Sequence, residues 1–295
     1  MKHKTVLLKE AIDGLALTPE STIVDATFGS GGHAREIVRM QNERGTYIGI
    51  DADKTALDGQ KFEEAKGTVH LVNDNFENIT EIVRSLHIAK VDGILADLGW
   101  RMEQFAEGNK GFSFNVDEPL LMTFGEPSTY PFTATDIVNE WDEEVLANIF
   151  YGYAEETAAR KISRAIIEAR KKEQIDTTFK LRDVVMASVP KAALHRGIHP
   201  ATKVFQALRI AVNDELGVLE RFLGKGFEIL SPGGRMAIIT FHSIEDRVVK
   251  HFFRELVQAD RGELFTKKPI APTREEVVEN PRARSAKMRI ITKSN

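Results

Sequence analysis

Residues 22–33 read Thr-Ile-Val-Asp-Ala-Thr-Phe-Gly-Ser-Gly-Gly-His, and this stretch carries the clearest sign of an α/β fold. A short apolar run ends in an acid, glycines follow, and a helical pattern begins directly after them. Glycine lets the backbone turn tightly and approach a ligand, while the next helix offers free N–H groups. Asp51 closes the following apolar run, where a carboxylate can accept hydrogen bonds from ribose hydroxyls. We expect a nucleotide or nucleoside to bind here.

Strand and helix patterns alternate on the C-terminal side of this loop. The expected strands are 22–26, 46–50, 69–72 and 91–96, and the expected helices are 34–41, 55–65 and 79–86. Strands that alternate with helices indicate βαβ units and a parallel sheet. Each strand is short and bounded by Gly, Asp or Asn, as buried central strands are.

The alternation stops after Gly99. An irregular segment at 105–131 is followed by helical patterns that open at Asp142 and continue at 155–172 and 179–189. Near Pro200 the first pattern resumes, with one long helix over 205–230, a strand at 235–241, a helix at 244–257 and a last strand at 286–292. We therefore predict a Rossmann-like α/β domain built from residues 1–104 and 200–295, with an inserted helical domain at 105–199.

Composition excludes several classes of protein. The 295 residues include no cysteine, which removes disulfide scaffolds and thiolate metal sites. The first ten residues contain only three consecutive apolar residues, so we expect neither secretion nor a membrane span and place the protein in the cytoplasm. The net charge of −4 argues against a protein that coats nucleic acid non-specifically.

Local charge differs from the net charge. Residues 281–295 hold basic side chains and no acid, and 160–172 is also rich in Lys and Arg. We predict that four of the C-terminal residues contact RNA phosphates: Arg282, Arg284, Lys287 and Arg289. The alternative is that these residues are solvent-exposed charges beside the last strand and do not bind RNA.

The strand at 91–96 ends in Asp97-Leu98-Gly99-Trp100. Ligands of open α/β sheets bind at the carboxyl ends of the strands. The placement resembles the Asp-Pro-Pro-aromatic motif of methyltransferases that modify exocyclic amines, in which an aromatic ring stacks on the base. Asp97 and Trp100 are therefore our candidate catalytic residues. A turn cap for Asp97, and packing against the insertion for Trp100, remain the alternatives.

Two other patterns have plainer interpretations. In Phe241-His242-Ser243-Ile244-Glu245-Asp246-Arg247 we interpret Ser243 as a helix cap with Asp246 at the third position, near a capping box. No His or carboxylate spacing in the chain predicts a metal site. Gly29-x-Gly31-x-x-Ala34 also fits the dinucleotide pattern, so a nicotinamide-dependent oxidoreductase stays open.

Several long motifs together resemble the bacterial 16S ribosomal RNA cytosine-N4 methyltransferases, the RsmH family, also called MraW. The resemblance covers nearly the whole chain and rests on residues 3–10, 25–33, 97–99, 111–114, 199–210, 232–235, 241–247 and 280–287. It implies a class I methyltransferase sheet whose helical insertion recognises the substrate. It further implies methyl transfer from S-adenosyl-L-methionine to N4 of a decoding-site cytidine in the small ribosomal subunit.

The resemblance also implies a set of cofactor contacts: Gly31, Gly32, His33, Asp51, Phe76, Asp97 and Gln104. The sequence departs from the family after Gly99, where Trp100-Arg101-Met102 replaces a residue and two serines. It departs again at residues 117–125, where an acid and an arginine are lost and Glu118 stands for a glycine. These departures motivate an alternative hypothesis, a catalytically weakened ribosome-assembly or RNA-binding protein that keeps the fold.

Overall fold

The computed structural model describes residues 4–99, 109–189 and 199–295. Backbone contacts divide the chain into two compact units. The sheet unit comprises Met1–Gly99 and Gly217–Asn295, and the helical unit comprises Trp100–Leu216. Within the described ranges, no helix has both the length and the apolar character that crossing a bilayer requires.

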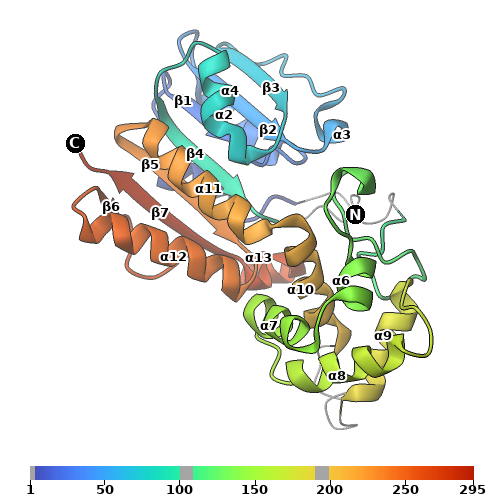
Figure 1. The fold of residues 1–295 in the computed structure, drawn as a ribbon. Coiled ribbons are helices and arrows are strands. Elements are labelled where there is room, and N and C mark those ends of the chain that lie inside the picture. The colour runs from blue at the N-terminus through green and yellow to red at the C-terminus, as the bar shows by residue number, and fades with distance from the viewer. Residues whose placement is uncertain (1–3, 100–108, 190–198) are drawn as a thin grey trace. The chain divides into compact units, whose positions relative to one another are not determined.

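The sheet unit is built on one mixed sheet in the order β3-β2-β1-β4-β5-β7-β6 (Figure 1). Its strands are β1 (Thr22–Asp25), β2 (Thr46–Asp51), β3 (Thr68–Asn73), β4 (Val91–Asp97), β5 (Leu230–Thr240), β6 (Gly262–Leu264) and β7 (Lys287–Lys293). The first five strands in this order pair in parallel, and β7 pairs antiparallel with both of its neighbours, β5 and β6. The expected Rossmann-like α/β class is confirmed.

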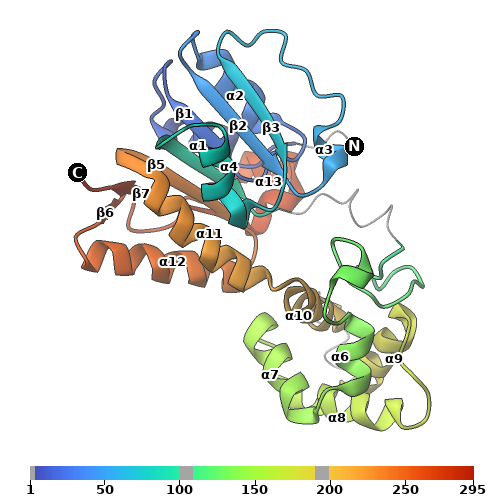
Figure 2. The same ribbon diagram turned by 45° about the horizontal axis from the view of Figure 1, so that its top comes forward.

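Helices cover both faces of this sheet. One face packs against α4 (Ile79–Ser85), α11 (Glu215–Ile229) and α12 (Ser243–Gln258). The other packs against α1 (Leu8–Leu15) and α2 (Gly32–Met40). Figures 1 and 2 show α11 and α12 along the same side of the sheet. Successive residues such as Ile23 and Val24 alternate between the two cores, because neighbouring side chains of a strand point to opposite faces.

The strand order reverses at β1, which is the feature that positions a site. The chain moves outward from β1 to β2 and β3, then returns to place β4 on the other side of β1. At such a switch point the loops after neighbouring strands diverge and leave room for a ligand at their carboxyl ends. Short elements complete this region, namely α3 (Lys54–Leu57) and the 3₁₀ turn η1 (Phe76–Asn78).

The helical unit has a core of its own. Its helices are α6 (Ala134–Glu140), α7 (Glu143–Ala154), α8 (Ala159–Arg170), α9 (Thr178–Ser188) and α10 (Ala201–Asn213), with a 3₁₀ turn η2 (Pro127–Thr129). Fully buried side chains from four of these helices meet, among them Val138, Phe150, Ile162 and Leu208. Since α10 packs here, the boundary between the units falls after residue 216 rather than after residue 199.

Three expectations about single elements are wrong. The helix expected at 55–65 ends at Leu57, because Asp58 is extended and Gly59 is left-handed. The single helix expected at 205–230 is two helices, because Asp214 adopts φ 47° between them. The cap of α12 is His242 and not Ser243: the His242 ring accepts the Glu245 N–H, and the Glu245 carboxylate accepts the His242 N–H.

Candidate cofactor and catalytic site

The backbone of the glycine-rich loop after β1 favours glycine at its two turning points. Gly29 and Gly31 have φ of 58° and 72°, a region that L side chains rarely adopt. A Cβ on Gly31 would also lie 2.9 Å from the Phe28 ring. The loop leads directly into α2, whose first N–H groups have no partner within the helix. The loop therefore lets a ligand approach its backbone closely at the N-terminus of a helix.

Asp51 stands at the end of β2 and holds this loop. Its carboxylate accepts the N–H of Gly29 at 2.8 Å and the N–H of Asp53 at 2.9 Å. The side chain is only half-buried, and a carboxylate has about four acceptor positions. Asp51 can therefore bind a ligand's hydroxyl groups while it fixes the backbone of the glycine-rich loop.

Asp97 stands at the end of β4, on the opposite side of β1. Its backbone N–H donates to Thr27 Oγ1 at 2.6 Å, which ties the end of β4 to the glycine-rich loop. Its carboxylate accepts the N–H of Gly99 at 3.1 Å. A Cβ on Gly99 would lie 2.8 Å from the Phe241 ring, so glycine lets the chain pass close to the end of β5.

Desolvation by the surrounding protein raises the pKa of Asp97 to about 7, and the negative charges of Asp25 and Glu245 add to this effect. The hydrogen bond from Gly99 opposes it. At neutral pH a substantial fraction of this carboxyl is protonated. Such a group can change its proton occupancy during a reaction at physiological pH.

Asp25 is buried at the end of β1, where it pairs with Leu95 of β4, two residues before Asp97. Its carboxylate accepts the Tyr47 hydroxyl at 2.8 Å and the Thr27 N–H at 3.2 Å. Burial raises the pKa of Asp25 to about 6, against the effect of these two hydrogen bonds. Tyr47, Asp25 and Thr27 thus link β2, β1 and β4 beneath the site.

Two further predicted contacts lie on neighbouring elements. Phe76 is partly buried in η1 after β3 and packs edge-on against Phe222 with ring centroids 4.9 Å apart. His33 is buried in the first turn of α2. Gln104 and Trp100 lie outside the described residues.

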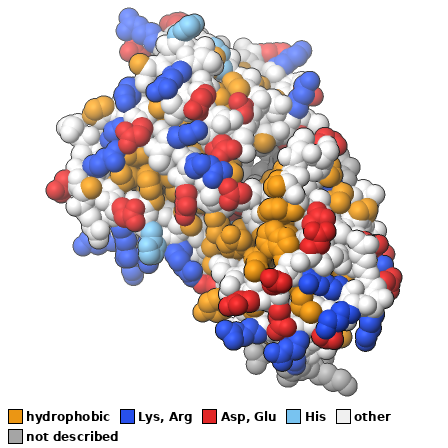
Figure 3. Space-filling model, viewed as in Figure 1, with side chains coloured by type: hydrophobic (Ala, Val, Ile, Leu, Met, Phe, Trp, Pro, Cys, Tyr) orange, Lys and Arg blue, Asp and Glu red, His pale blue; other side chains and the backbone are white. Residues whose placement is uncertain are grey.

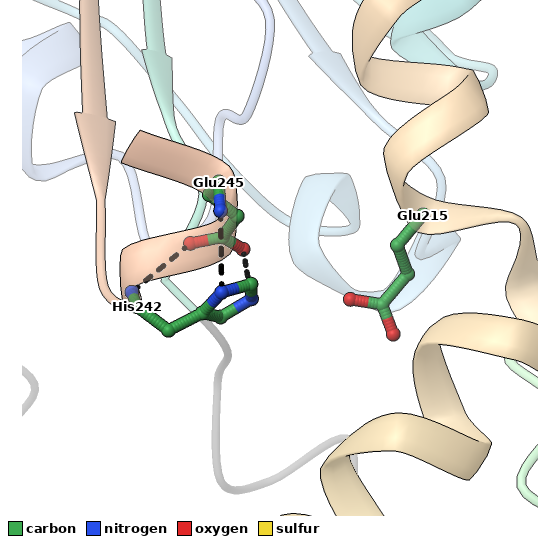
Figure 4. A group of neighbouring side chains, drawn as sticks. All are labelled: Glu215, His242 and Glu245. Atoms are coloured by element: carbon green, nitrogen blue, oxygen red, sulfur yellow. Dashed lines mark hydrogen bonds and ion pairs between the residues drawn. The ribbon is translucent and has the colours of Figure 1, made fainter. Parts of the chain in front are cut away.

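The turn after β5 is fixed by a reciprocal cap. Figure 4 shows His242 and Glu245 bound to each other at the start of α12. Glu245 is buried and also accepts the Phe241 N–H at 3.0 Å. Since Phe241 contacts Gly99, this cap supports the segment that follows Asp97.

Comparison with known proteins identifies the family. The sequence pattern of the MraW methylase family matches residues 1–294. The chain belongs to the MraW methylase family. The protein named ribosomal RNA small subunit methyltransferase H from Acetivibrio thermocellus is 43% identical, over 99% of each chain. The protein of that name from Symbiobacterium thermophilum is 42% identical, over 99% of this chain and 96% of its own.

A solved rRNA methylase from Streptococcus thermophilus aligns with 100% of this MraW-family chain and 99% of its own, at 12% identity and a TM-score of 0.44. That similarity is too low to identify a function. Membership in the family rests on the sequence matches, and it confirms the resemblance drawn from the motifs.

The four predicted RNA contacts of this MraW-family chain differ in their surroundings. Arg282 and Arg284 are exposed on the 3₁₀ turn η4 (Pro281–Ser285). Arg289 instead binds Asp246 in two hydrogen bonds of 2.7 and 3.1 Å, and both side chains are 11% exposed. Lys287 lies 3.4 Å from the same carboxylate. The geometry leaves Arg282 and Arg284 as the stronger candidates.

The sequence did not predict the side chains that support the site through hydrogen bonds. Thr27 and Asp25 belong to the glycine-rich stretch, but the pattern of that stretch assigns them no role, and Tyr47 lies outside it. A polar residue inside an otherwise apolar strand, as Tyr47 is, was the available signal. Its buried hydroxyl needs a partner, and Asp25 on the neighbouring strand supplies it.

Proposed function

We propose that this MraW-family chain transfers a methyl group from S-adenosyl-L-methionine to N4 of a decoding-site cytidine in 16S ribosomal RNA. One observation carries the proposal: the glycine-rich loop, Asp51 and Asp97 follow three adjacent strands at the switch point of the sheet. A cofactor site and an acid that can face an amine therefore share one edge. The family and the names of its relatives support the reaction type.

The residues at this edge fit the cofactor. The glycine-rich loop would accept its amino-acid portion, Asp51 its ribose hydroxyls, and Phe76 one face of its adenine. His33, Gly31, Gly32, Gln104 and Asp97 complete the proposed contacts. When bound, S-adenosyl-L-methionine supplies an electrophilic methyl group with a good leaving group.

Asp97 is the proposed acceptor for the cytosine amine. The lone pair of that nitrogen is delocalised into the ring, so the enzyme must position it and increase its electron density. The Asp97 carboxylate would accept a hydrogen bond from the amine and could take its proton, since its raised pKa makes it a stronger base than an ordinary aspartate. Thr27 and Gly99 hold the backbone around this carboxylate in place.

Trp100 is the proposed stacking residue for the flipped or unpaired base, because it follows Asp97 at the spacing of the amine-methyltransferase motif. Stacking of this kind contributes about 1–3 kcal/mol per base. Trp100→Ala should therefore slow methyl transfer and leave cofactor affinity nearly unchanged. A variant that melts early but reacts normally when folded would show that Trp100 only packs.

RNA is the proposed partner, and we propose that a few local basic residues contact it. On the face shown in Figure 3, basic and acidic side chains are interspersed. Arg282 and Arg284 on η4 would bind backbone phosphates, which carry no sequence information. Base recognition would then come from Asp97 and Trp100, the residues proposed to hold the cytosine.

Calorimetry with S-adenosyl-L-methionine and with NAD tests the cofactor. We expect binding of the first and none of the second; the reverse result would favour an oxidoreductase. Single-turnover transfer of labelled methyl to purified small subunits then separates an active enzyme from a weakened RNA-binding relative. Cofactor and RNA binding without transfer would support the weakened protein.

A further inference from the structure

The segment before α1 lies between two parts of the chain that are far apart in sequence. On one side it meets helix α13 (Arg274–Glu279) and Asn280, which ends that helix. Glu276 accepts the Leu7 N–H at 2.8 Å, and Asn280 donates to the Lys4 carbonyl at 3.1 Å. Glu279 forms an ion pair with Lys4. Residues 4–7 are thus held by residues 276–280.

The bond to Glu276 fixes an unusual backbone conformation. Leu7 has φ 51° and ψ 35°, which residues other than glycine adopt rarely, and its side chain is fully buried. As the N-cap residue, directly before α1, Leu7 has no helical acceptor for its own N–H. The Glu276 carboxylate supplies that acceptor from the far end of the chain.

On its other side the same segment touches the glycine-rich loop. Thr5 lies so close to Gly32 that a Cβ on Gly32 would be 1.7 Å from Thr5 Oγ1 and 2.9 Å from Thr5 Cβ. Gly32 is the first residue of α2 and one of the proposed cofactor contacts. Whatever holds Thr5 in place therefore also limits where the loop can move.

The three parts share one hydrophobic core. Val6 and Leu7 from the segment, Phe28 from the loop, and Ala283 and Ala286 after α13 are all buried in it. Ala283 is fully buried, whereas Arg282 and Arg284 beside it are exposed. Movement of α13 would thus be transmitted to the loop through packed side chains and through the bonds to residues 4–7.

We propose that Glu276 is a positioning residue for cofactor binding: by accepting the Leu7 N–H it holds Thr5 against Gly32 and keeps the glycine-rich loop in its binding conformation. This inference rests on the proposed placement of the cofactor at that loop. Glu276 itself is not among the proposed contacts to cofactor or substrate. Glu276 changes the fraction of molecules whose loop is in the binding conformation. The apparent dissociation constant increases in proportion as that fraction falls.

The test uses the full chain with S-adenosylhomocysteine as the probe. Glu276→Ala removes the acceptor, whereas Glu276→Gln keeps a side-chain carbonyl that can accept the same N–H. We expect affinity to fall about ten-fold in Glu276→Ala, if the binding conformation falls to about a tenth of the population, and to recover in Glu276→Gln. Hydrogen exchange of residues 28–34 should speed up in Glu276→Ala alone.

Two matched variants make the result decisive. Glu275→Ala changes an exposed acid next to Glu276 in α13 and should leave affinity and exchange unchanged. If Glu276→Ala does not fold, Asn280→Asp removes the donor to the Lys4 carbonyl, a second bond that holds residues 4–7, and should likewise lower affinity and speed up exchange of residues 28–34. Calorimetry is done well below the melting temperature of every variant, so that lost stability is not mistaken for lost affinity.

Asp51→Ala separates the two proposals. If it loses affinity while Glu276→Ala binds normally with unchanged exchange, the positioning role is overturned and the cofactor site stands. If both variants bind normally, the proposed placement of the cofactor at the glycine-rich loop is wrong. The role of Glu276, which depends on that placement, is then overturned as well. Reduced affinity in both, with rescue by Glu276→Gln, supports both proposals.

Discussion

At the scale of single residues, Asp97 combines two properties that an exposed aspartate lacks. It is held through its own backbone by Thr27, and desolvation raises its pKa to about 7. Its position after an apolar strand was readable from the sequence, because a carboxyl at the end of a central strand is a local pattern. Its pKa was not readable, since Asp25 and Glu245 contribute to it from other elements.

The raised pKa of Asp97 predicts a pH dependence. The single-turnover rate should rise with pH up to about 7 and then level off, because the carboxylate is the reactive form. Asp97→Asn should be slow and lose this inflection. A wild-type rate that is flat between pH 5.5 and 8.5, about 1.5 units either side of that pKa, would contradict the role of Asp97.

The raised pKa of Asp97 also makes the stability of the protein depend on pH, and in the direction opposite to that of the reaction rate. Between the ordinary pKa of 3.8 and about 7, the folded protein keeps a proton on Asp97 that the unfolded chain has released. The free energy of unfolding should therefore fall as pH rises through this window, and Asp97→Asn should reduce that slope. Urea unfolding across the pH range measures it; identical slopes in both proteins would argue against the shift.

Asp51 should contribute both to ligand binding and to the shape of the loop. Asp51→Ala removes a charged acceptor for ribose hydroxyls and frees the Gly29 N–H, so cofactor binding should weaken by about 1–3 kcal/mol. Calorimetry measures the change. Asp58→Ala, an exposed acid shortly after β2, is the matched control and should bind normally.

At the scale of elements, the sequence predicted six of the seven strands that the structure describes, because each contains an apolar run bounded by polar or glycine residues. It did not predict β6, which has only three residues, Gly-Glu-Leu. It failed where one residue changes the backbone. Asp214 interrupts a continuous amphipathic pattern with a left-handed conformation, and a partly buried ion pair between Arg209 and Glu215 spans the turn. Periodicity cannot detect such a break, since the apolar spacing continues in phase on both sides.

The pair between Asp246 and Arg289 joins α12 to β7, and it predicts a large loss of stability. Arg289→Ala would leave a buried carboxylate without its main partner, so it should cost about 3–5 kcal/mol. Arg284→Ala removes an exposed arginine and should change the free energy of unfolding by less than about 0.5 kcal/mol. Urea unfolding compares them; equal, small losses would show that the pair contributes little.

At the scale of the whole molecule, bonds between distant parts of the chain were the hardest to predict. The glycine-rich loop, Asp51 and Asp97 follow β1, β2 and β4 of one alternating series of strands and helices, so their convergence follows from the order of the strands in the sheet. The bond between Leu7 and Glu276 joins residues 269 positions apart. No local pattern signals it, because a glutamate in a short exposed helix has no special spacing.

RNA binding should depend on the exposed arginines of η4. Replacing Arg282 and Arg284 together by alanine should weaken binding and lower the slope of log affinity against log salt by about 1 for each phosphate that is no longer neutralised. The matched control replaces Arg44 and Lys66, two exposed cations elsewhere on the sheet unit. Filter binding across salt concentrations measures both. Equal slopes in the two double variants would indicate a solvated charge run.

Methylation of a cytidine in the small ribosomal subunit is the proposal on which the roles of Asp97, Trp100 and the cofactor contacts depend. Mass spectrometry of small-subunit RNA should be done on cells with the gene, without it, and with the Asp97→Ala form restored. We predict that one N4-methylated cytidine at the decoding site is present in the first, absent in the second and not restored by the variant. The same methylation in all three, or a loss at a different base, would contradict the proposal.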